Sequence, residues 1–175
     1  SSQEEAAWHE IRNAYRTRKV LTGILGGIEH VDAKKDVVIV NYNGYRIVIP
    51  VDEMMIQLNR QNKDIKIAVR QRQIIGNMLG AEIDFVIMGI DGKSRSIVAS
   101  RKAAMLRKQN LFYLTPTPNG NFRIEEGQVV EGRVIAVAEK GIRVDVFGVE
   151  TTMVARDLSW HWIGDAQEHF NIGDK

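Results

Sequence analysis

The fold of this chain is decided by a stretch near its C-terminal end, residues 126–160, which read EGQVVEGRVIAVAEKGIRVDVFGVETTMVARDLSW. Apolar residues alternate with charged ones along two runs in it. The positions expected to face a core are Val130, Gly132, Val134, Ile142, Val144 and Val146, and those expected to face water are Glu131, Arg133, Arg143 and Asp145. A period of two predicts short strands. Glycines at 132, 141 and 148 fall where a coiled sheet bends or turns, so the stretch predicts part of a small barrel.

Four separated motifs in this region resemble the S1 RNA-binding domain. They are GQVVEGRV from Gly127, KGIRV from Lys140, RDLSW from Arg156 and FNIGD from Phe170. The S1 domain is a five-stranded OB fold that binds single-stranded RNA across its first three strands. The resemblance therefore implies an OB barrel over residues 126–175 and a role in RNA binding.

The first half of the chain repeats the same motifs. The segments that correspond are 19–25 with 128–134, 37–44 with 141–148, 51–54 with 155–158, and 80–82 with 173–175. Gly23 and Gly44 are separated by 21 positions and Gly132 and Gly148 by 16, and we place the insertion in a loop. An internal repeat of this kind predicts two copies of one structural unit.

These observations predict a mainly β protein with two five-stranded, S1-type OB barrels in tandem. We expect an N-terminal helix over 1–17, a first barrel over 18–100, a helix and a Pro/Asn/Gly linker over 101–125, and a second barrel over 126–175. The first barrel ends in a hairpin, with strands over 83–90 and 96–100 around the Asp-Gly turn of 91–94. The second copy stops before its fourth and fifth strands, so we expect it to be incomplete and the natural protein to continue beyond residue 175.

Composition narrows the class of protein. The chain has 175 residues, 44% of them hydrophobic and 26% charged, and it has no cysteine. Disulfide and thiol chemistry are excluded, and no apolar run is long enough to suggest a membrane span. The four histidines show no spacing typical of metal ligands, and residues 89–94 lack the first glycine of a phosphate-binding loop. We expect a cytoplasmic, non-catalytic protein with no cofactor, no metal and no membrane partner.

Positive charge is concentrated in the middle of the chain. Residues 59–108 hold 11 Lys or Arg against 4 Asp or Glu, a net charge of +7. Five of these cations lie in a basic insertion over 57–73, where the first copy is longer than the second. A basic patch of this kind is typical of a surface that binds a polyanion, although it is also compatible with a solvated face.

The resemblance also shows what is missing. S1 domains place aromatics and a histidine on the RNA-binding face, whereas the corresponding positions here are Lys140, Arg143 and Val154 in the second copy and Asp36, Ile39 and Pro50 in the first. Without these stacking side chains, affinity should be modest and mainly electrostatic. The predicted RNA-binding residues are Arg60, Lys63, Lys66, Arg70, Arg72, Arg133, Lys140, Arg143, Arg156 and Trp160.

The sequence thus favours binding of single-stranded RNA, either mRNA or rRNA, by a ribosome-associated or translation-related protein. Two alternatives stay open. The first is a protein-docking scaffold whose S1 folds have lost affinity for RNA, and the second is an RNA-targeting module of a larger ribonuclease.

Overall fold

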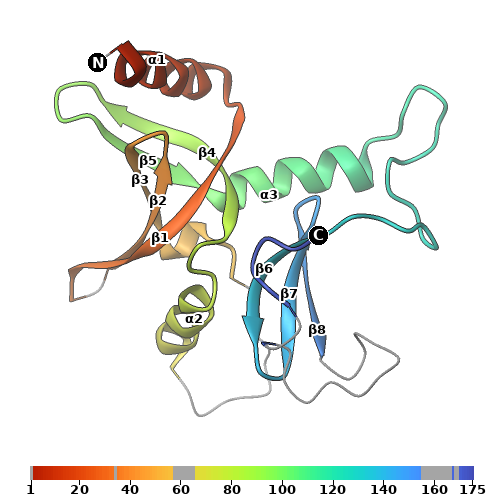
Figure 1. Cartoon of the computed structure of the whole chain (residues 1–175). Helices are drawn as coiled ribbons and strands as arrows, with labels where there is room; N and C mark the ends of the chain where they lie inside the picture. The colour runs from red at the N-terminus through yellow and green to blue at the C-terminus, as the bar shows by residue number, and fades with distance from the viewer. Residues whose placement is uncertain (1, 34, 57–65, 155–166, 168–169) are drawn as a thin grey trace. The chain divides into compact units, whose positions relative to one another are not determined.

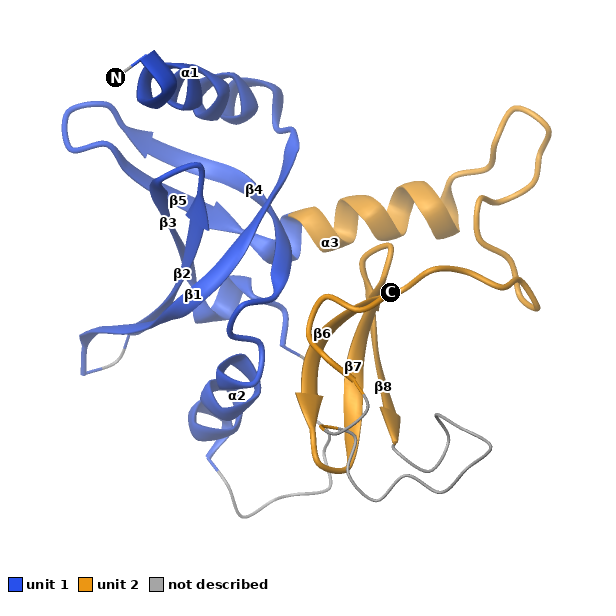
Figure 2. Cartoon of the chain, viewed as in Figure 1, with its two compact units in different colours: residues 1–103 blue, residues 104–175 orange. Residues whose placement is uncertain are grey.

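A computed structural model describes residues 2–33, 35–56, 66–154, 167 and 170–175. The chain divides into two compact units, Ser1–Ala103 and Ala104–Lys175 (Figure 2). Each unit is described by itself below.

Unit 1 is a closed barrel of five strands in the order β1-β2-β3-β5-β4 (Figure 1). The strands are β1 (Val20–Asp32), β2 (Lys35–Tyr42), β3 (Tyr45–Pro50), β4 (Glu82–Asp91) and β5 (Ser96–Ser100). Antiparallel pairing of β1 with β4 and parallel pairing of β3 with β5 close the barrel. This half is therefore the five-stranded OB-like barrel that the sequence predicted, and it includes the β4–β5 hairpin.

Two helices cover the ends of this barrel (Figure 1). Helix α1 (Ser2–Thr17) buries Ala7, Trp8, Ile11 and Ala14, which follow one another at helical spacing. Helix α2 (Ile67–Gly76) lies in the connection between β3 and β4, after the short 3₁₀ helix η1 (Val51–Glu53), and buries Ile74 and Ile75. The barrel interior between them is filled by apolar side chains that include Val38, Val40, Ile47, Ile49, Phe85 and Ile87.

Unit 2 contains most of helix α3 (Arg101–Gln109), the π-helical turn η2 (Asn110–Leu114) and a three-stranded antiparallel sheet. The strands, in sheet order, are β6 (Arg133–Ala138), β7 (Gly141–Val146) and β8 (Val149–Val154). Val134, Ile142 and Val144 form the core, and Val137, Val146 and Phe170 pack against it. A five-stranded barrel in this half stays a prediction, because residues 155–166 and 168–169 lie outside the described part.

Two details of the predicted strands in unit 2 are wrong. The first strand begins at Arg133, so Val130 lies before it and is exposed instead of contributing to the core. Asp145 was expected to face water but is only 7% exposed, because it pairs with Arg133. Alternation of side chains along β6 is also interrupted by a bulge between Val134 and Ala136.

The two units repeat the same pairing of their first two strands. Leu25 lies opposite Val40 in unit 1, and Val134 lies opposite Val144 in unit 2, at the positions that the sequence repeat matched. In each unit a bulge follows at once, after Leu25 and after Val134. A shift of one residue would have turned every side chain to the other face, so the shared register confirms the alignment of these strands.

The turn that follows is also repeated. Asn43 and Gly44 join β2 to β3, and Phe147 and Gly148 join β7 to β8. All four residues have positive φ, between 45° and 91°. Two consecutive residues with positive φ are typical of the two-residue turn that matches the twist of a hairpin.

A third repeated feature joins each sheet to the segment that returns after it. In unit 1, the Leu25 amide donates to the Ala81 carbonyl and the Gly80 amide donates to the Leu25 carbonyl, both at 2.9 Å. In unit 2, the Val134 amide donates to the Asp174 carbonyl at 2.8 Å and the Gly173 amide donates to the Val134 carbonyl at 2.9 Å. The predicted match of 80–82 with 173–175 is thus confirmed at the level of individual hydrogen bonds.

The predicted position of the insertion is wrong. Two residues separate β1 from β2, and two separate β6 from β7, so the loops are equally long. The extra residues instead lengthen the strands: β1 has 13 residues and β2 has 8, against 6 in each of β6 and β7. The added positions pair with one another, as His30 does with Asp36, because an extended hairpin satisfies its own backbone groups.

In each unit the helix before the sheet contacts the second turn. In unit 1, the Tyr42 hydroxyl donates to Glu10 of α1 at 2.5 Å and the Trp8 ring lies 5.6 Å from that of Tyr45. In unit 2, Gln109 donates to the Gly148 carbonyl at 2.7 Å and Phe112 stacks on Phe147 at 4.2 Å. The repeated unit is therefore a helix followed by a three-stranded meander.

Substitution of the repeated glycine by alanine should destabilise each unit. A Cβ atom would lie 2.7 Å from Val40 Cγ1 at Gly23 and 2.5 Å from Val144 Cγ1 at Gly132. We expect Gly23→Ala and Gly132→Ala each to lower the free energy of unfolding by about 1–3 kcal/mol in urea titrations, as overpacking does. Gly27→Ala in the same strand as Gly23 is the control, since no atom lies within 4 Å of its Cβ position. Equal stability of Gly23→Ala and Gly27→Ala would contradict the close approach of Val40 to Gly23.

Candidate nucleic-acid interface

The outward face of the β6–β8 sheet carries two cross-strand ion pairs. Arg133 Nη2 lies 3.1 Å from Asp145 Oδ2, and Arg143 Nη1 lies 2.6 Å from Glu150 Oε1. Both arginine side chains are 17% exposed, and the carboxylates are 7% and 4% exposed. The predicted phosphate contacts Arg133 and Arg143 are therefore present on one face, but each is neutralised by a buried carboxylate.

Asp145 also holds the turn beside this face. Its Oδ1 accepts a hydrogen bond of 2.9 Å from the Gly148 amide. Nearby, the Tyr113 hydroxyl donates to the Val146 carbonyl at 2.7 Å, and burial, with a smaller contribution from the charge of Asp145, raises the pKa of Tyr113. The carboxylate thus accepts from Arg133 on β6 and from Gly148 in the β7–β8 turn, and it stabilises the sheet.

The other predicted residues of this half lie elsewhere. Lys140 is exposed in the turn between β6 and β7. Arg156 and Trp160 lie outside the described residues. Of the predicted cations that the structure describes in unit 2, Lys140 is the one with an exposed side chain.

In unit 1, the basic insertion lies partly on α2. Lys66 precedes the helix, and Arg70 is on its first turn and donates to Gln73 at 3.5 Å. Arg72 Nε lies 2.9 Å from Asp36 Oδ2, and His30 Nδ1 lies 2.6 Å from Asp36 Oδ1. The hydrogen bond from His30, together with the charge of Arg72, lowers the pKa of Asp36. Arg60 and Lys63 lie outside the described residues.

A groove of about 520 Å³ runs beside this ion pair. It is lined by Asp36, Val37, Val48, Pro50, Arg72 and Val98, among others, and none of its described lining residues is aromatic. Two of the three positions at which S1 domains place stacking side chains, Asp36 and Pro50, are in this lining, whereas Ile39 is buried. The structure thus brings Arg72 of the basic insertion beside two of the positions that the sequence matched to the family's stacking residues.

Sequence reasoning missed the acidic partners Asp36, Asp145 and Glu150. The signal was present in the sequence, because Asp145 follows Arg143 by two residues on the same face of β7. The sequence alone did not give the register of the strands. Strand pairing places Asp145 opposite Arg133 on β6 and opposite Glu150 on β8.

Comparison with known proteins identifies the second half. The family model for the S1 RNA-binding domain matches residues 123–175. This part of the chain is an S1 domain. The resemblance predicted from the four motifs is confirmed.

The whole chain is similar to proteins of two kinds. It is 26% identical to the small ribosomal subunit protein bS1 of Coxiella burnetii and 24% identical to that of Pseudomonas aeruginosa, each over 97% of this chain. It is also 28% identical, over 99% of its length, to the 4-hydroxy-3-methylbut-2-enyl diphosphate reductase of Clostridium acetobutylicum. The chain covers 27%, 26% and 24% of these proteins, so it spans about a quarter of their length.

The matches to the S1 domain and to the ribosomal proteins support RNA binding. The similarity to the reductase is weak. Within the described ranges, no three His, Asp or Glu side chains are grouped so that they could hold a metal ion. No helix in the described part of the chain is long and apolar enough to cross a membrane.

Loss of the Asp145 carboxylate should destabilise the S1 domain. Asp145→Ala would remove the ion pair with Arg133 and the hydrogen bond that Asp145 accepts from the Gly148 amide. We expect the free energy of unfolding to fall by about 3 kcal/mol in urea titrations. Glu131→Ala is the control, because Glu131 is exposed and its Oε1 lies 3.9 Å from Lys175 Nζ. This substitution should change the free energy of unfolding by less than about 0.5 kcal/mol. A similar loss in both variants would rule out a special role for Asp145.

Proposed function

We propose that this chain binds single-stranded RNA through its S1 domain, without catalysis, in a translation-related setting. The observation that carries the proposal is the match of residues 123–175 to the S1 RNA-binding domain. The ribosomal relatives support the setting, since each is a small ribosomal subunit protein bS1. They also support a cytoplasmic location and the ribosome as a partner.

We further propose that unit 1 is also an S1-type domain and that it acts in tandem with the S1 domain of unit 2. Its support is the repeated geometry: the same register, the same bulge, the same turn and the same pair of hydrogen bonds to the returning segment. Two such domains in one chain would extend the length of RNA that is bound.

The RNA contacts that we propose are electrostatic and lie mainly on the basic insertion. Lys66 and Arg70 are not paired with a carboxylate within the described residues, and Arg60 and Lys63 add to the same segment. Arg133 and Arg143 should contribute less, because a phosphate would have to compete with a carboxylate that already neutralises each. Lys140 is the exposed cation that we assign to the S1 domain face, and Arg156 and Trp160 remain proposed contacts.

Removal of two of these charges should weaken binding and flatten its salt dependence. Each phosphate contact that is lost lowers the slope of log affinity against log salt by about 0.7 for a single strand. We expect Lys66→Gln/Arg70→Gln to lower affinity for a labelled 20-nucleotide RNA in fluorescence anisotropy and to reduce the slope by about 1.4. The control is Lys102→Gln/Lys175→Gln, which has the same total charge. Equal affinity and slope in the two variants would place the contacts elsewhere.

Binding should discriminate between single and double strands. An OB barrel binds an extended strand along one face and cannot accept the fixed spacing of a duplex backbone in the same way. We expect unlabelled single-stranded RNA to compete for the labelled strand at lower concentration than duplex RNA or duplex DNA of equal phosphate content. Equal competition by all three would mean that the positive charge acts as a general polyanion patch.

A second candidate function is protein docking. It is favoured by the neutralised arginines of the S1 face and by the mainly apolar groove beside α2, in which Val37, Val48, Pro50 and Val98 lie. The RNA titration separates the two functions, because a docking scaffold would show no saturable RNA binding even at low salt.

A further inference from the structure

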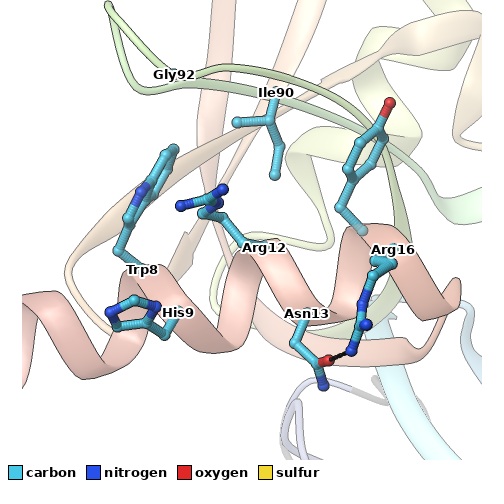
Figure 3. A pocket seen from close by; sticks show the side chains of 8 residues that line it. Trp8, His9, Arg12, Asn13, Arg16, Ile90 and Gly92 are labelled. Atoms are coloured by element: carbon cyan, nitrogen blue, oxygen red, sulfur yellow. Dashed lines mark hydrogen bonds between the residues drawn. The ribbon is translucent and has the colours of Figure 1, made fainter.

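Unit 1 contains a second cavity, between helix α1 and the β4–β5 hairpin. It has a volume of about 740 Å³ and is open to solvent. Ile90 and Gly92 line it from the hairpin, and Trp8, His9 and Arg12 are among the residues that line it from α1 (Figure 3). Figure 3 shows Arg12 extending from the helix towards Ile90. We call this cavity the α1 groove.

The lining of the α1 groove is positively charged. Arg12 and Arg16 both line it and are exposed, and no carboxylate is among the described lining residues. Arg16 donates to the Asn13 side-chain oxygen at 2.8 Å, and neither arginine forms an ion pair within the described part of the chain (Figure 3). Two guanidinium groups without carboxylate partners make a site that suits an anion with several oxygen atoms.

Two of the three glutamates of α1, Glu4 and Glu10, line a different pocket, which Asn43 of the β2–β3 turn also lines. Glu5 is exposed and shares the helical face of His9, Arg12 and Arg16, but it is not among the described lining residues of the α1 groove. Glu10 accepts a hydrogen bond of 2.5 Å from the Tyr42 hydroxyl, and the Glu4 carbonyl accepts one of 3.0 Å from Tyr45. Burial, reinforced by Glu10, raises the pKa of Tyr42, so the tyrosine keeps its proton and remains a donor. Glu4 and Glu10 therefore lie on the side of the helix above the β2–β3 turn, whereas Arg12 and Arg16 lie on the side above the hairpin.

The hairpin adds to this positive charge. Asp91 accepts hydrogen bonds from the backbone amides of Lys93 and Ser94, which lower its pKa and direct its carboxylate to its own turn. The guanidinium of Arg95 lies 5.0 Å from the centre of the Trp8 ring and donates to the Tyr45 hydroxyl at 2.9 Å. Cations thus flank the groove on the hairpin side as well as on the helix side.

Aromatic rings complete the lining. Tyr15 lines the groove with an exposed ring, and the Arg18 guanidinium lies 5.0 Å from its centre. Trp8 lines the same groove at its other end. Arginines interleaved with aromatic rings are the combination that holds a phosphate together with a flat base.

We propose that the α1 groove binds a nucleotide, with the phosphate on Arg12 and Arg16 and the base against the aromatic lining. The nucleotide is either one unit of an RNA strand or a free mononucleotide, since both present the same phosphate and base. The residues of this site differ from those that we assign to the S1 domain face and to the basic insertion, so the site does not depend on the function proposed above. A volume of about 740 Å³ lies in the range of natural small-molecule sites.

The proposal can be tested on the full chain by NMR. The ¹⁵N-labelled protein is titrated with uridine 5′-monophosphate, with a single-stranded eight-nucleotide RNA and with inorganic phosphate at matched ionic strength. We expect the nucleotide or the RNA to shift the amide signals of Asn13, Arg16 and Gly92, and Arg12→Gln/Arg16→Gln to weaken this binding by about tenfold or more. Asn13→Asp should weaken it too, because it adds a carboxylate to the groove. Both variants replace exposed side chains, and unchanged melting temperatures will show that they fold.

Lys102→Gln/Lys175→Gln is the matched control, because it removes two charges outside the groove. It should leave binding of the mononucleotide unchanged.

Shifts caused by the mononucleotide indicate a free-nucleotide site, and shifts caused by the RNA alone indicate a site for one unit of a strand; both support the proposal. Absence of shifts with either ligand, or equal affinity for inorganic phosphate and for the nucleotide, would overturn it. RNA binding without shifts in the groove would overturn this proposal alone, whereas mononucleotide shifts in a chain without affinity for longer RNA would overturn the proposed function alone.

Discussion

Each half of this protein depends on a short pair of backbone hydrogen bonds between the first strand and the segment that returns after the meander. Leu25 makes this pair with Gly80 and Ala81, and Val134 makes it with Gly173 and Asp174. Gly80 and Gly173 both have positive φ, a conformation that side chains rarely adopt. The bonds lie next to the bulge, where the first strand bends and needs partners on its second edge. The repeated sequence thus reflects the same backbone hydrogen-bonding requirement in both halves.

The same framework carries different chemistry in the two halves. Position 145 of β7 holds an aspartate that pairs with Arg133, whereas the matching position of β2 holds Asn41, opposite Ile24. The outward face of the S1 domain is consequently a set of neutralised charges, and that of unit 1 is partly apolar. In the described part of unit 1, arginines without a carboxylate partner lie instead on the flanking helices, at Arg70 on α2 and at Arg12 on α1. Shared architecture therefore does not require a shared binding surface.

Much of the fold could be predicted from the sequence, because alternation and glycine spacing are local signals. The hairpin of β4 and β5, helix α1 and the start of α3 at Ser100, whose hydroxyl accepts from the Ala103 amide at 3.0 Å, were all accessible in this way. The location of the five inserted residues could not be predicted. The alternation of apolar and polar residues does not show whether inserted residues form a loop or lengthen the two paired strands. The α1 groove was also missed. It needs Arg12 and Ile90 in one place, and residues so far apart in sequence meet only through the closed barrel.

The order of helix and meander has a consequence for how the chain is made. In both halves the helix is synthesised before the turn that it contacts, and the bonds between them join residues 32 and 41 positions apart in unit 1 and 39 and 33 apart in unit 2. Each helix is therefore followed by its partner after a few dozen further residues have been synthesised. The first helix and its three strands can therefore assemble while the second copy is still being translated. Assembly in this order would keep the two similarly paired meanders from exchanging strands, which is a characteristic misfolding error of repeat proteins.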